Sequence, residues 1–338
     1  MSKVRQYKWD NLKALLILCV VIGHMIEPDA ENSEVCRALF VFVYTFHMPL
    51  FLFISGYFHK NTNIKNKIIF YLVLGVLLRI MTYCVHTLAM GEGGDLKLAA
   101  SDGVHWFFFA LAAHTALAYL FRDYDKYLIL ILALILGCFS GYDQSIGDFL
   151  TLSRIIVFFP FYWCGYCLHE SGRFSDMISP EKKYLKYIKA AAGLLVIVLW
   201  AYLCLNRTEE VYELRPFFTG RNAFSQEYAL SVMGLMTRIK CYVISAVTGL
   251  ALICMMPDGR IPVISGTGER SLSVCFWHRL LIYIIADAGL LDLIYEIPYG
   301  TVICIGISAV MTLILGTKVC FKPLAWLRQK LTDPHRTG

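Results

Sequence analysis

A lysine and a histidine, Lys13 and His24, stand eleven positions apart in one apolar stretch near the N-terminus. At about 100° per residue this spacing amounts to three helical turns plus about 20°, so both side chains leave the same helix face roughly 16 Å apart. Histidine suits proton transfer near neutral pH, and lysine suits contact with a phosphate. Ionisable side chains at membrane depth are rare and commonly mark a functional path, so this helix is the first candidate for chemistry. The plainer interpretation is a signal-anchor helix whose lysine reaches the interface and whose histidine lies near the far headgroups.

The composition identifies the class of protein that must hold these two side chains. The chain has 338 residues, of which 58% are hydrophobic and only 17% are charged. Apolar runs of about 17 to 25 residues recur between short polar loops, which is typical of a polytopic membrane protein. We expect an all-α fold with ten transmembrane helices and a single membrane domain over residues 1–338. The expected spans are residues 12–26, 36–58, 68–90, 104–121, 127–141, 151–168, 188–205, 230–256, 271–290 and 298–317.

Lysine and arginine residues gather in alternate loops and at both ends of the chain. They include Lys3, Arg5 and Lys8, then Lys60, Lys65 and Lys67, then Lys182, Lys183, Lys186 and Lys189, and finally Lys318, Lys322, Arg328, Lys330 and Arg336. With ten spans, all of these positions fall on one side, which the positive-inside rule identifies as cytoplasmic. Both termini are therefore expected in the cytoplasm. The formal net charge of +6 reflects this topology and does not indicate nucleic-acid binding.

The second expected span carries polar features of its own. His47 falls about mid-membrane, and Pro49 lacks the N–H that would continue the helical ladder. The carbonyl that Pro49 leaves without a partner needs a buried or wet polar neighbour, so we expect one nearby. Ser55 and Gly56 follow near the inner end, where small residues allow close approach of another helix or of a ligand.

These two segments together resemble the opening of the acyltransferase 3 family, in particular its fucose 4-O-acetylase-like branch. The family carries Arg or Lys, ten residues and then His in its first transmembrane helix. Its later motifs also have counterparts here, in the family's order. They are His105-Trp106-Phe107-Phe108, then Ser153-Arg154-Ile155 to Phe158-Phe159-Pro160-Phe161 with Gly165-Tyr166, then Gly268-Glu269-Arg270-Ser271-Leu272-Ser273 to Trp277-His278. The departures are small: Lys13 replaces the commoner Arg, and Cys275-Phe276-Trp277 stands where Tyr and Leu are more usual.

The resemblance implies transfer of an acyl group, usually acetyl, from cytoplasmic acyl-CoA to a hydroxyl of a carbohydrate at the outer membrane face. Acetyl-CoA would be the co-substrate, with no metal, and a carbohydrate the acceptor. The protein would be a multi-pass protein of the bacterial cytoplasmic membrane. The expected topology fits this activity, because Lys13 would lie at the cytoplasmic edge and His24 near the outer edge of one helix.

The expected reaction assigns a role to each candidate residue. His24 and Arg154 are the catalytic candidates. His24 would act as a general base or carry the acetyl group itself, and both routes stay open. Arg154 would stabilise the oxyanion or hold the acceptor. The donor candidates are Lys13, Asp10, Ser55, Tyr57, Arg79 and His278, and the acceptor candidates are Trp106, His47 and Arg238.

Several of these assignments have simpler alternatives. Lys13 could only pair with Asp10, three residues before it on the same face. His278 could only make an interhelical hydrogen bond. Trp106 and Arg154 both open spans from the outside, so they could converge with His24. The long loop from 206 to 229, with Arg215, Pro216 and Arg221, is expected to shape the acceptor site.

A second hypothesis is a transporter or flippase of a glycan or of a lipid-linked precursor. Buried Arg and His residues and proline-interrupted spans would serve such a protein equally well. Transporter folds often consist of two similar halves, and no such repeat is apparent in this chain. An acyltransferase with a longer or a succinyl donor is a third possibility.

Overall fold

The computed structural model describes residues 6–90, 103–143, 145–146, 151–178, 183–221, 224–225, 228 and 231–332. Within these ranges the regular structure is helical throughout, without strands. Five helical segments are long and apolar enough to cross a membrane: Tyr7–Asp29, Glu34–Tyr57, Ile64–Thr87, Lys183–Asn206 and Met233–Met255. Two bent helix pairs raise this number to as many as seven. The expectation of an all-α polytopic membrane protein is confirmed, whereas ten spans and two cytoplasmic termini stay predictions.

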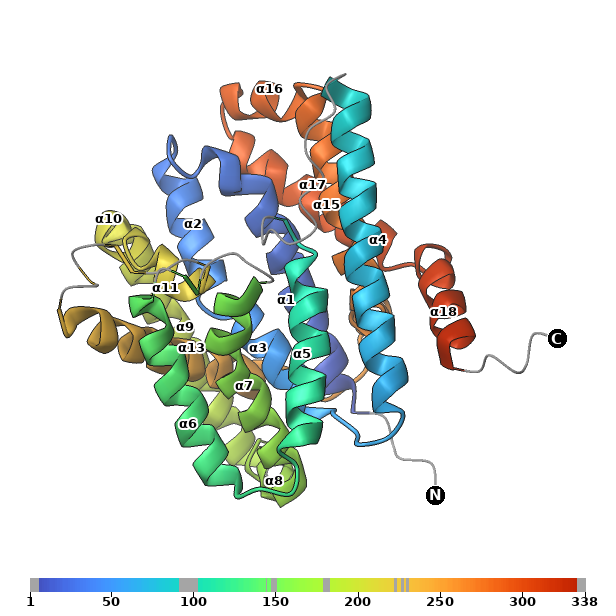
Figure 1. Cartoon of the computed structure of the whole chain (residues 1–338). Helices are drawn as coiled ribbons and strands as arrows, with labels where there is room; N and C mark the ends of the chain where they lie inside the picture. Colours follow the sequence, from blue (N-terminus) through green and yellow to red (C-terminus); the bar gives the residue numbers. More distant parts are fainter. Residues whose placement is uncertain are drawn as a thin grey trace.

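Each of the ten expected spans coincides with helix in the structure (Figure 1). Their counterparts are α1 (Tyr7–Ile26), α2 (Glu34–Tyr44) with α3 (His47–Tyr57), α4 (Ile64–Met90), α5 (Trp106–Leu120), α6 (Lys126–Phe139), α7 (Leu152–Ser171), α9 (Lys183–Asn206), α13 (Met233–Met255), α15 (Ser271–Asp287) and α17 (Gly300–Leu315). Shorter helices join or flank them: η1 (Glu27–Asp29), η2 (Ser140–Tyr142), α8 (Arg173–Ile178), α10 (Thr208–Tyr212), α11 (Arg215–Thr219), α14 (Pro262–Glu269), α16 (Leu290–Glu296) and α18 (Lys318–Thr332).

Helix α1 forms the centre of the bundle. Leu12, Leu16 and Val21 on it are completely buried, although they lie on different sides of the helix. A helix that is hydrophobic all round belongs in a core, and α1 packs against α14, α15, α17, α2 and α3. Because α1 lies between these helices, its packing determines where Lys13 and His24 lie in the bundle.

The first turns of α1 are held by α14, a short helix that the span pattern did not predict. Asn11 Nδ2 donates to the carbonyls of Pro257 and Gly259, both at 2.9 Å, and Ser265 Oγ donates to Asn11 Oδ1 at 2.6 Å. A Cβ added at Gly268 would lie 1.7 Å from the carbonyl oxygen of Asp10, so only glycine permits this approach. Close packing therefore sets the position of the α1 turn that carries Lys13.

The second span is broken between α2 and α3, at Thr45 and Phe46. Pro49 cannot donate to the carbonyl of Thr45, four residues earlier, and Ser245 Oγ donates to that oxygen instead at 2.6 Å. Trp200 Nε1 donates to Thr45 Oγ1 at 3.2 Å. The expected polar neighbour is thus present. His47 begins the second half of the broken span, with Nδ1 2.8 Å from the carbonyl of Val43.

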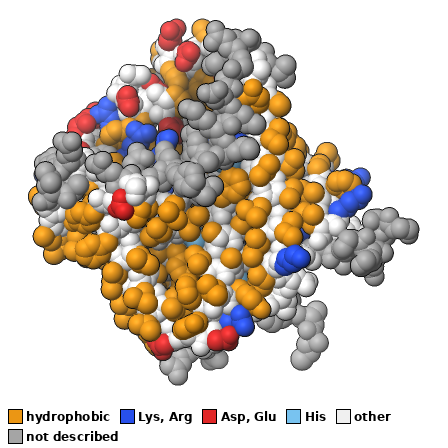
Figure 2. Space-filling model, viewed as in Figure 1, with side chains coloured by type: hydrophobic (Ala, Val, Ile, Leu, Met, Phe, Trp, Pro, Cys, Tyr) orange, Lys and Arg blue, Asp and Glu red, His pale blue; other side chains and the backbone are white. Residues whose placement is uncertain are grey.

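The outer faces of several helices carry exposed hydrophobic side chains. On α6, Ile131, Leu132 and Leu136 are 45 to 60% exposed. Figure 2 shows hydrophobic side chains gathered across the middle of this face, with most of the visible charged side chains above, below or at its edge. Because such surfaces are costly in water, they are expected to contact the hydrocarbon of a bilayer.

Candidate active site

A cavity of about 670 Å³ lies alongside α1 and extends from Lys13 to His24 and Glu27. The prediction that Lys13 and His24 share one helix face is confirmed, because both line this cavity. Its two ends are called here the Lys13 end and the His24 end. The lining residues are Lys13, Ile17, Val20, His24, Glu27, Tyr44, His47, Met48, Phe51, Ile54, Ser55, Tyr71, Gly103, Val104, Trp106, Phe107, Leu111, Arg154, Phe158, Arg215, Pro216, Phe218, Thr219, Arg221, Ser271, Leu272, Cys275, Arg279 and Tyr283.

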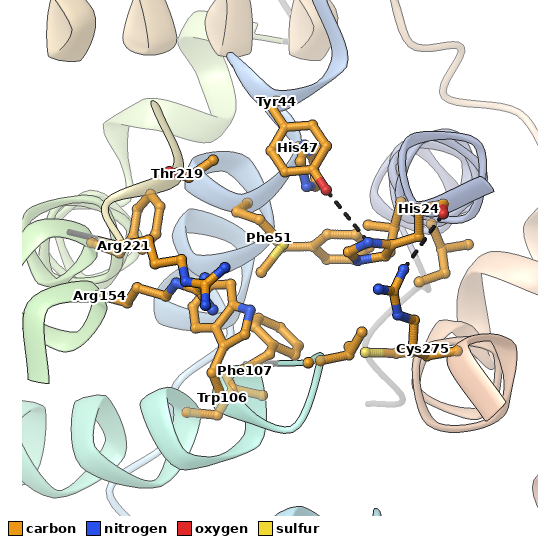
Figure 3. Close-up of a pocket in the computed structure, with 18 of the residues that line it drawn as sticks. His24, Tyr44, His47, Phe51, Trp106, Phe107, Arg154, Thr219, Arg221 and Cys275 are labelled. Atoms are coloured by element: carbon orange, nitrogen blue, oxygen red, sulfur yellow. Dashed lines mark hydrogen bonds between the residues drawn. The ribbon is translucent and has the colours of Figure 1, made fainter. Parts of the chain in front are cut away.

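The side chain of His24 makes its polar contacts through one ring nitrogen, Nδ1. Nδ1 lies 3.2 Å from Glu27 Oε2 and 3.4 Å from the hydroxyl of Tyr44, the second of which is drawn in Figure 3. The imidazole also stacks on the ring of His278, with the centroids 5.5 Å apart. Nε2 of His24 has no hydrogen-bond partner among the described residues. This nitrogen is therefore the one available to a molecule in the cavity.

Glu27 contacts three basic side chains from three different elements. It begins η1, one turn after His24, and its Oε2 lies 3.7 Å from Arg279 Nη1 of α15. Its Oε1 lies 3.9 Å from Arg215 Nη2 of α11. Arg279 also donates to the carbonyl of His24 at 3.4 Å. One carboxylate thus faces one imidazole and two guanidinium groups at the His24 end.

Arg154 and Trp106 form the wall opposite His24 (Figure 3). The guanidinium carbon of Arg154 lies 4.5 Å from the centre of a Trp106 ring, within the range of a cation–π contact. Trp106 in turn stacks on Phe158, with the ring centroids 5.8 Å apart. The expected convergence of Trp106 and Arg154 on the cavity of His24 is confirmed.

At the Lys13 end, a lysine lies beside an acidic residue one turn before it on the same helix. Lys13 Nζ lies 2.9 Å from Asp10 Oδ1, so the expected local pairing is present. Lys13 still lines the cavity, whereas Asp10 is buried behind it. Ser55 also lines this part, and its hydroxyl donates to the carbonyl of Phe51 at 2.8 Å. Tyr71 of α4 lines the cavity as well.

Four further candidates lie outside the cavity lining. Tyr57 packs on Trp9 with the ring centroids 4.7 Å apart, and Arg79 Nη1 lies 3.1 Å from Nε2 of His105. Arg238 is completely buried and donates to the carbonyl of Phe217. His278 lies behind the ring of His24, with Nδ1 2.8 Å from the carbonyl of Val274 one turn earlier in its own helix. The structure does not place these four side chains on the wall that a substrate would contact.

The three lining residues that contact His24 with polar groups were not among the sequence candidates: Glu27, Tyr44 and Arg279. Glu27 follows His24 by three positions and so lies on the same helix face, a spacing that could have identified it. Arg279 is adjacent to His278 of the late motif. Tyr44 lies just before the break in the second span and gave no signal in the sequence. Arg215 and Arg221, expected to shape the acceptor site, do line the cavity.

The chemistry of the lining favours acid–base work by organic side chains. Among the described residues, no group of three or more His, Cys, Asp or Glu side chains is arranged to hold a metal ion. The cavity instead offers an imidazole with one open nitrogen, a carboxylate and several guanidinium groups. This set can remove a proton from a hydroxyl group and stabilise a developing negative charge.

Comparison with known proteins places these features in a family. The chain is 24% identical over 227 residues to nodulation protein NolL of Sinorhizobium fredii (strain NBRC 101917 / NGR234), a match that covers 60% of this chain and 56% of that protein. The chain thus spans little more than half of that relative. No solved structure matches it. A family described as "Acyltransferase domain" matches residues 6–316, which include every residue of the cavity wall. The chain therefore belongs to the acyltransferase 3 family.

Proposed function

We propose that this acyltransferase moves an acetyl group from acetyl-CoA on the cytoplasmic side to a hydroxyl group of a carbohydrate at the outer face of the membrane. Membership of the family supports the acyl transfer. The donor, the acceptor and the sidedness are our proposals, based on the chemistry of the cavity and on the lysine and arginine distribution.

The observation that carries the proposal is one cavity whose wall includes both Lys13 and His24. Coenzyme A has phosphates at one end and the thioester at the tip of a long flexible arm. Phosphates beside Lys13 would find a cation, and the arm could then extend along α1 toward His24. The two side chains of one helix would thus bind opposite ends of the same donor molecule.

The acceptor would enter at the His24 end. Trp106 and Arg154 both line this chamber, so a sugar ring would contact the edge of the Trp106 indole and the Arg154 guanidinium group. His47 and Thr219 also line this chamber and supply polar groups for sugar hydroxyls. The sugar hydroxyl would then lie between Arg154 and the open Nε2 of His24.

The transfer requires one proton to move from the acceptor to the departing sulfur. In one route the sugar oxygen attacks the thioester carbonyl while His24 Nε2 takes the hydroxyl proton. The C–O bond forms, the C–S bond breaks, and His24 returns the proton to the sulfur, which leaves as free CoA. In the other route His24 Nε2 attacks the thioester carbonyl first, so that the N–C bond forms, the C–S bond breaks and CoA departs as the thiolate. The sugar oxygen then attacks the acetyl carbon, the N–C bond breaks, and the hydroxyl proton passes to the thiolate. In both routes Arg154 would stabilise the negative charge on the carbonyl oxygen.

The test uses the full-length protein in nanodiscs, with acetyl-CoA and a panel of carbohydrate acceptors. Release of free CoA and mass spectrometry of the acceptor measure the transfer. We expect wild-type protein to form an O-acetyl ester and His24→Ala to lose that activity at an unchanged melting temperature. A wild-type protein that transfers another acyl group would contradict the acetyl donor. One that moves a glycan across the bilayer and consumes no acyl-CoA would contradict the proposal as a whole.

A further inference from the structure

We propose that Glu27 is the positioning residue for His24, and that Arg279 and Arg215 hold Glu27 in place for that purpose. This inference rests on the proposed function, because it assumes that His24 performs acyl transfer. Its basis is the set of contacts that converge on the Glu27 carboxylate, each between described residues.

The first step concerns the proton on the imidazole. Glu27 Oε2 lies 3.2 Å from Nδ1 of His24, and an ionised carboxylate can only accept a hydrogen bond. The proton of a neutral imidazole is therefore held on Nδ1, which leaves the lone pair on Nε2. Nε2 has no hydrogen-bond partner in the part of the chain that the structure describes, and His24 lines the cavity. The same relation of carboxylate, imidazole and open nitrogen prepares a general base or a nucleophile in other enzymes.

The second step concerns the tyrosine that approaches the same nitrogen. The hydroxyl of Tyr44 lies 3.4 Å from Nδ1, slightly farther than Glu27. A hydrogen bond to a charged acceptor is shorter and stronger than one to a neutral acceptor. The carboxylate is therefore the main partner of Nδ1. Tyr44 closes the remaining side of the ring, so that His24 has little freedom to turn its Nδ1 edge into the cavity.

The third step concerns what fixes Glu27 itself. Arg279 reaches Oε2 from α15 and Arg215 reaches Oε1 from α11, so each carboxylate oxygen faces its own guanidinium group. Arg215 is itself anchored, since it donates to the hydroxyl of Tyr212 at 2.8 Å and lies 5.2 Å from the ring centre of Phe40. Glu27 is thus oriented by groups that do not belong to α1. A carboxylate held in this way gives the imidazole a defined direction before substrate arrives.

The experiment measures kcat and KM for acetyl transfer by Glu27→Gln, Glu27→Ala and Glu27→Asp in nanodiscs. Gln keeps the size of the side chain but removes the charge, so kcat is expected to fall by up to about 10⁴-fold, the loss known for a carboxylate behind a catalytic histidine that becomes an amide. KM for acetyl-CoA is expected to stay within about twofold, because Lys13 lies three turns away. Asp, which keeps the charge on a shorter arm, should recover part of the lost kcat.

Two further variants separate positioning from folding. Glu31→Gln removes a charge from an exposed residue of the same loop and should leave kcat unchanged. The double variant of His24→Ala with Glu27→Gln should be no slower than His24→Ala alone, because Glu27 acts only through His24. If Glu27→Gln does not fold, Arg279→Lys keeps the charge but displaces the contact, and it should lower kcat with a normal melting temperature.

Three results would overturn the assignment, and they differ from failure of the proposed function. The first is a folded Glu27→Gln protein with wild-type kcat. The second is a rise in KM at constant kcat, which would make Glu27 a binding residue. The third is a further loss in the double variant beyond that of His24→Ala. In all three the wild-type protein transfers acetyl groups, so the proposed function stands. A wild-type protein without acyl transfer would overturn both proposals together.

Discussion

Both ends of the cavity contain an acidic and a basic side chain three positions apart on the same segment, but the two pairs are built differently. At the Lys13 end, Asp10 and Lys13 both belong to α1 and are 2.9 Å apart. At the His24 end, the His24–Glu27 pair is also contacted by Arg279 from α15 and by Arg215 from α11. The same short-range spacing therefore places a lysine beside a carboxylate at one end, and an imidazole beside a carboxylate that two guanidinium groups from other elements also contact at the other.

The difference follows from what each end is proposed to do. Binding the phosphates of a donor needs charge within reach, and a lysine on a flexible stem can follow its ligand. Proton transfer needs a donor and an acceptor aligned within a few tenths of an ångström, so the imidazole must be fixed beforehand. We infer that the guanidinium groups from distant helices serve to orient the His24–Glu27 pair, and the following predictions test this inference.

The largest effect is expected for His24. Since general acid–base catalysis commonly contributes about 10²- to 10⁴-fold, His24→Ala should lower kcat by that amount. The matched variant is His278→Ala. It removes a histidine that stacks on His24 but does not itself line the cavity. It should cost less than a tenth of that loss. Equal losses in the two variants, measured as acetyl ester formed, would show that the stacked pair acts as a unit.

A second large effect is expected opposite His24. Arg154→Lys keeps the positive charge but loses the planar group that lies over Trp106. If Arg154 stabilises the oxyanion, kcat should fall by about 10²-fold, near the usual cost of one oxyanion donor. The control is Trp106→Phe, which keeps an aromatic surface and should mainly raise KM for the acceptor. A normal kcat in Arg154→Lys would remove Arg154 from the transition state.

Packing should matter more than charge at the Lys13 end. Gly268→Ala would place a methyl group 1.7 Å from the carbonyl oxygen of Asp10, so α14 must move away from α1. Overpacking of this kind typically costs about 1–3 kcal/mol of folding free energy. Gly306→Ala on α17 is the matched control, because its added Cβ meets nothing within 4 Å. Thermal melts of the two variants should separate clearly, and similar melting temperatures would contradict this packing argument.

A smaller effect is expected for Lys13. If Lys13 contacts a phosphate of the donor, Lys13→Met should raise KM for acetyl-CoA by about 10-fold, the equivalent of one modest charge-assisted contact. Because His24 and Glu27 are unaffected, kcat should change little. Lys13→Arg, which restores the commoner residue of the family, should bind the donor at least as well as wild type. A loss of kcat without change in KM would place Lys13 in the chemistry and remove the contrast between the two ends.

Local features of the site were predictable from sequence. The shared face of Lys13 and His24 follows from helix geometry alone. Because proline has no N–H, Pro49 predicted a backbone carbonyl that needs another donor, and Ser245 Oγ is that donor. The ten apolar segments were predictable as well, because the number of consecutive apolar residues can be counted in the sequence and compared with the thickness of a bilayer.

Contacts between distant helices were not predictable in this way. Arg279 and Arg215 reach Glu27 only because α15 packs beside α1 and α11 packs beside α2, and no local pattern encodes that arrangement. Arg79 and Arg238 lie in apolar segments, so each was expected to have a polar partner, but the sequence did not identify that partner. The structure supplies His105 for the first and the carbonyl and ring of Phe217 for the second.

The smallest effect is expected at the loop that anchors the first turn of α1. Asp258 contacts Lys186 and lies 3.5 Å from Lys8 Nζ. Partial burial alone would raise the pKa of Asp258, but the hydrogen bond from Lys186 and the charges of Lys8 and Lys186 lower it below its usual value of 3.8. The ionised carboxylate therefore stabilises the fold at neutral pH, and this contribution disappears as the pH falls through the lowered pKa.

Asp258→Asn removes that contribution at all pH values, so wild type and variant should differ most near neutral pH and converge in acid. Because the pair is partly exposed, the difference should stay below about 1 kcal/mol. Melting temperatures measured from neutral pH down through a series of acidic pH values check the sign, and a difference that does not shrink as the pH falls would contradict the assignment. Since Asp258 lies next to the first turn of α1 and His24 in its last, kcat should be unaffected. A loss of kcat in this variant would mean that the contacts of Asp258 at the start of α1 also set the orientation of His24 at its end. The two ends of the cavity would then be coupled through α1.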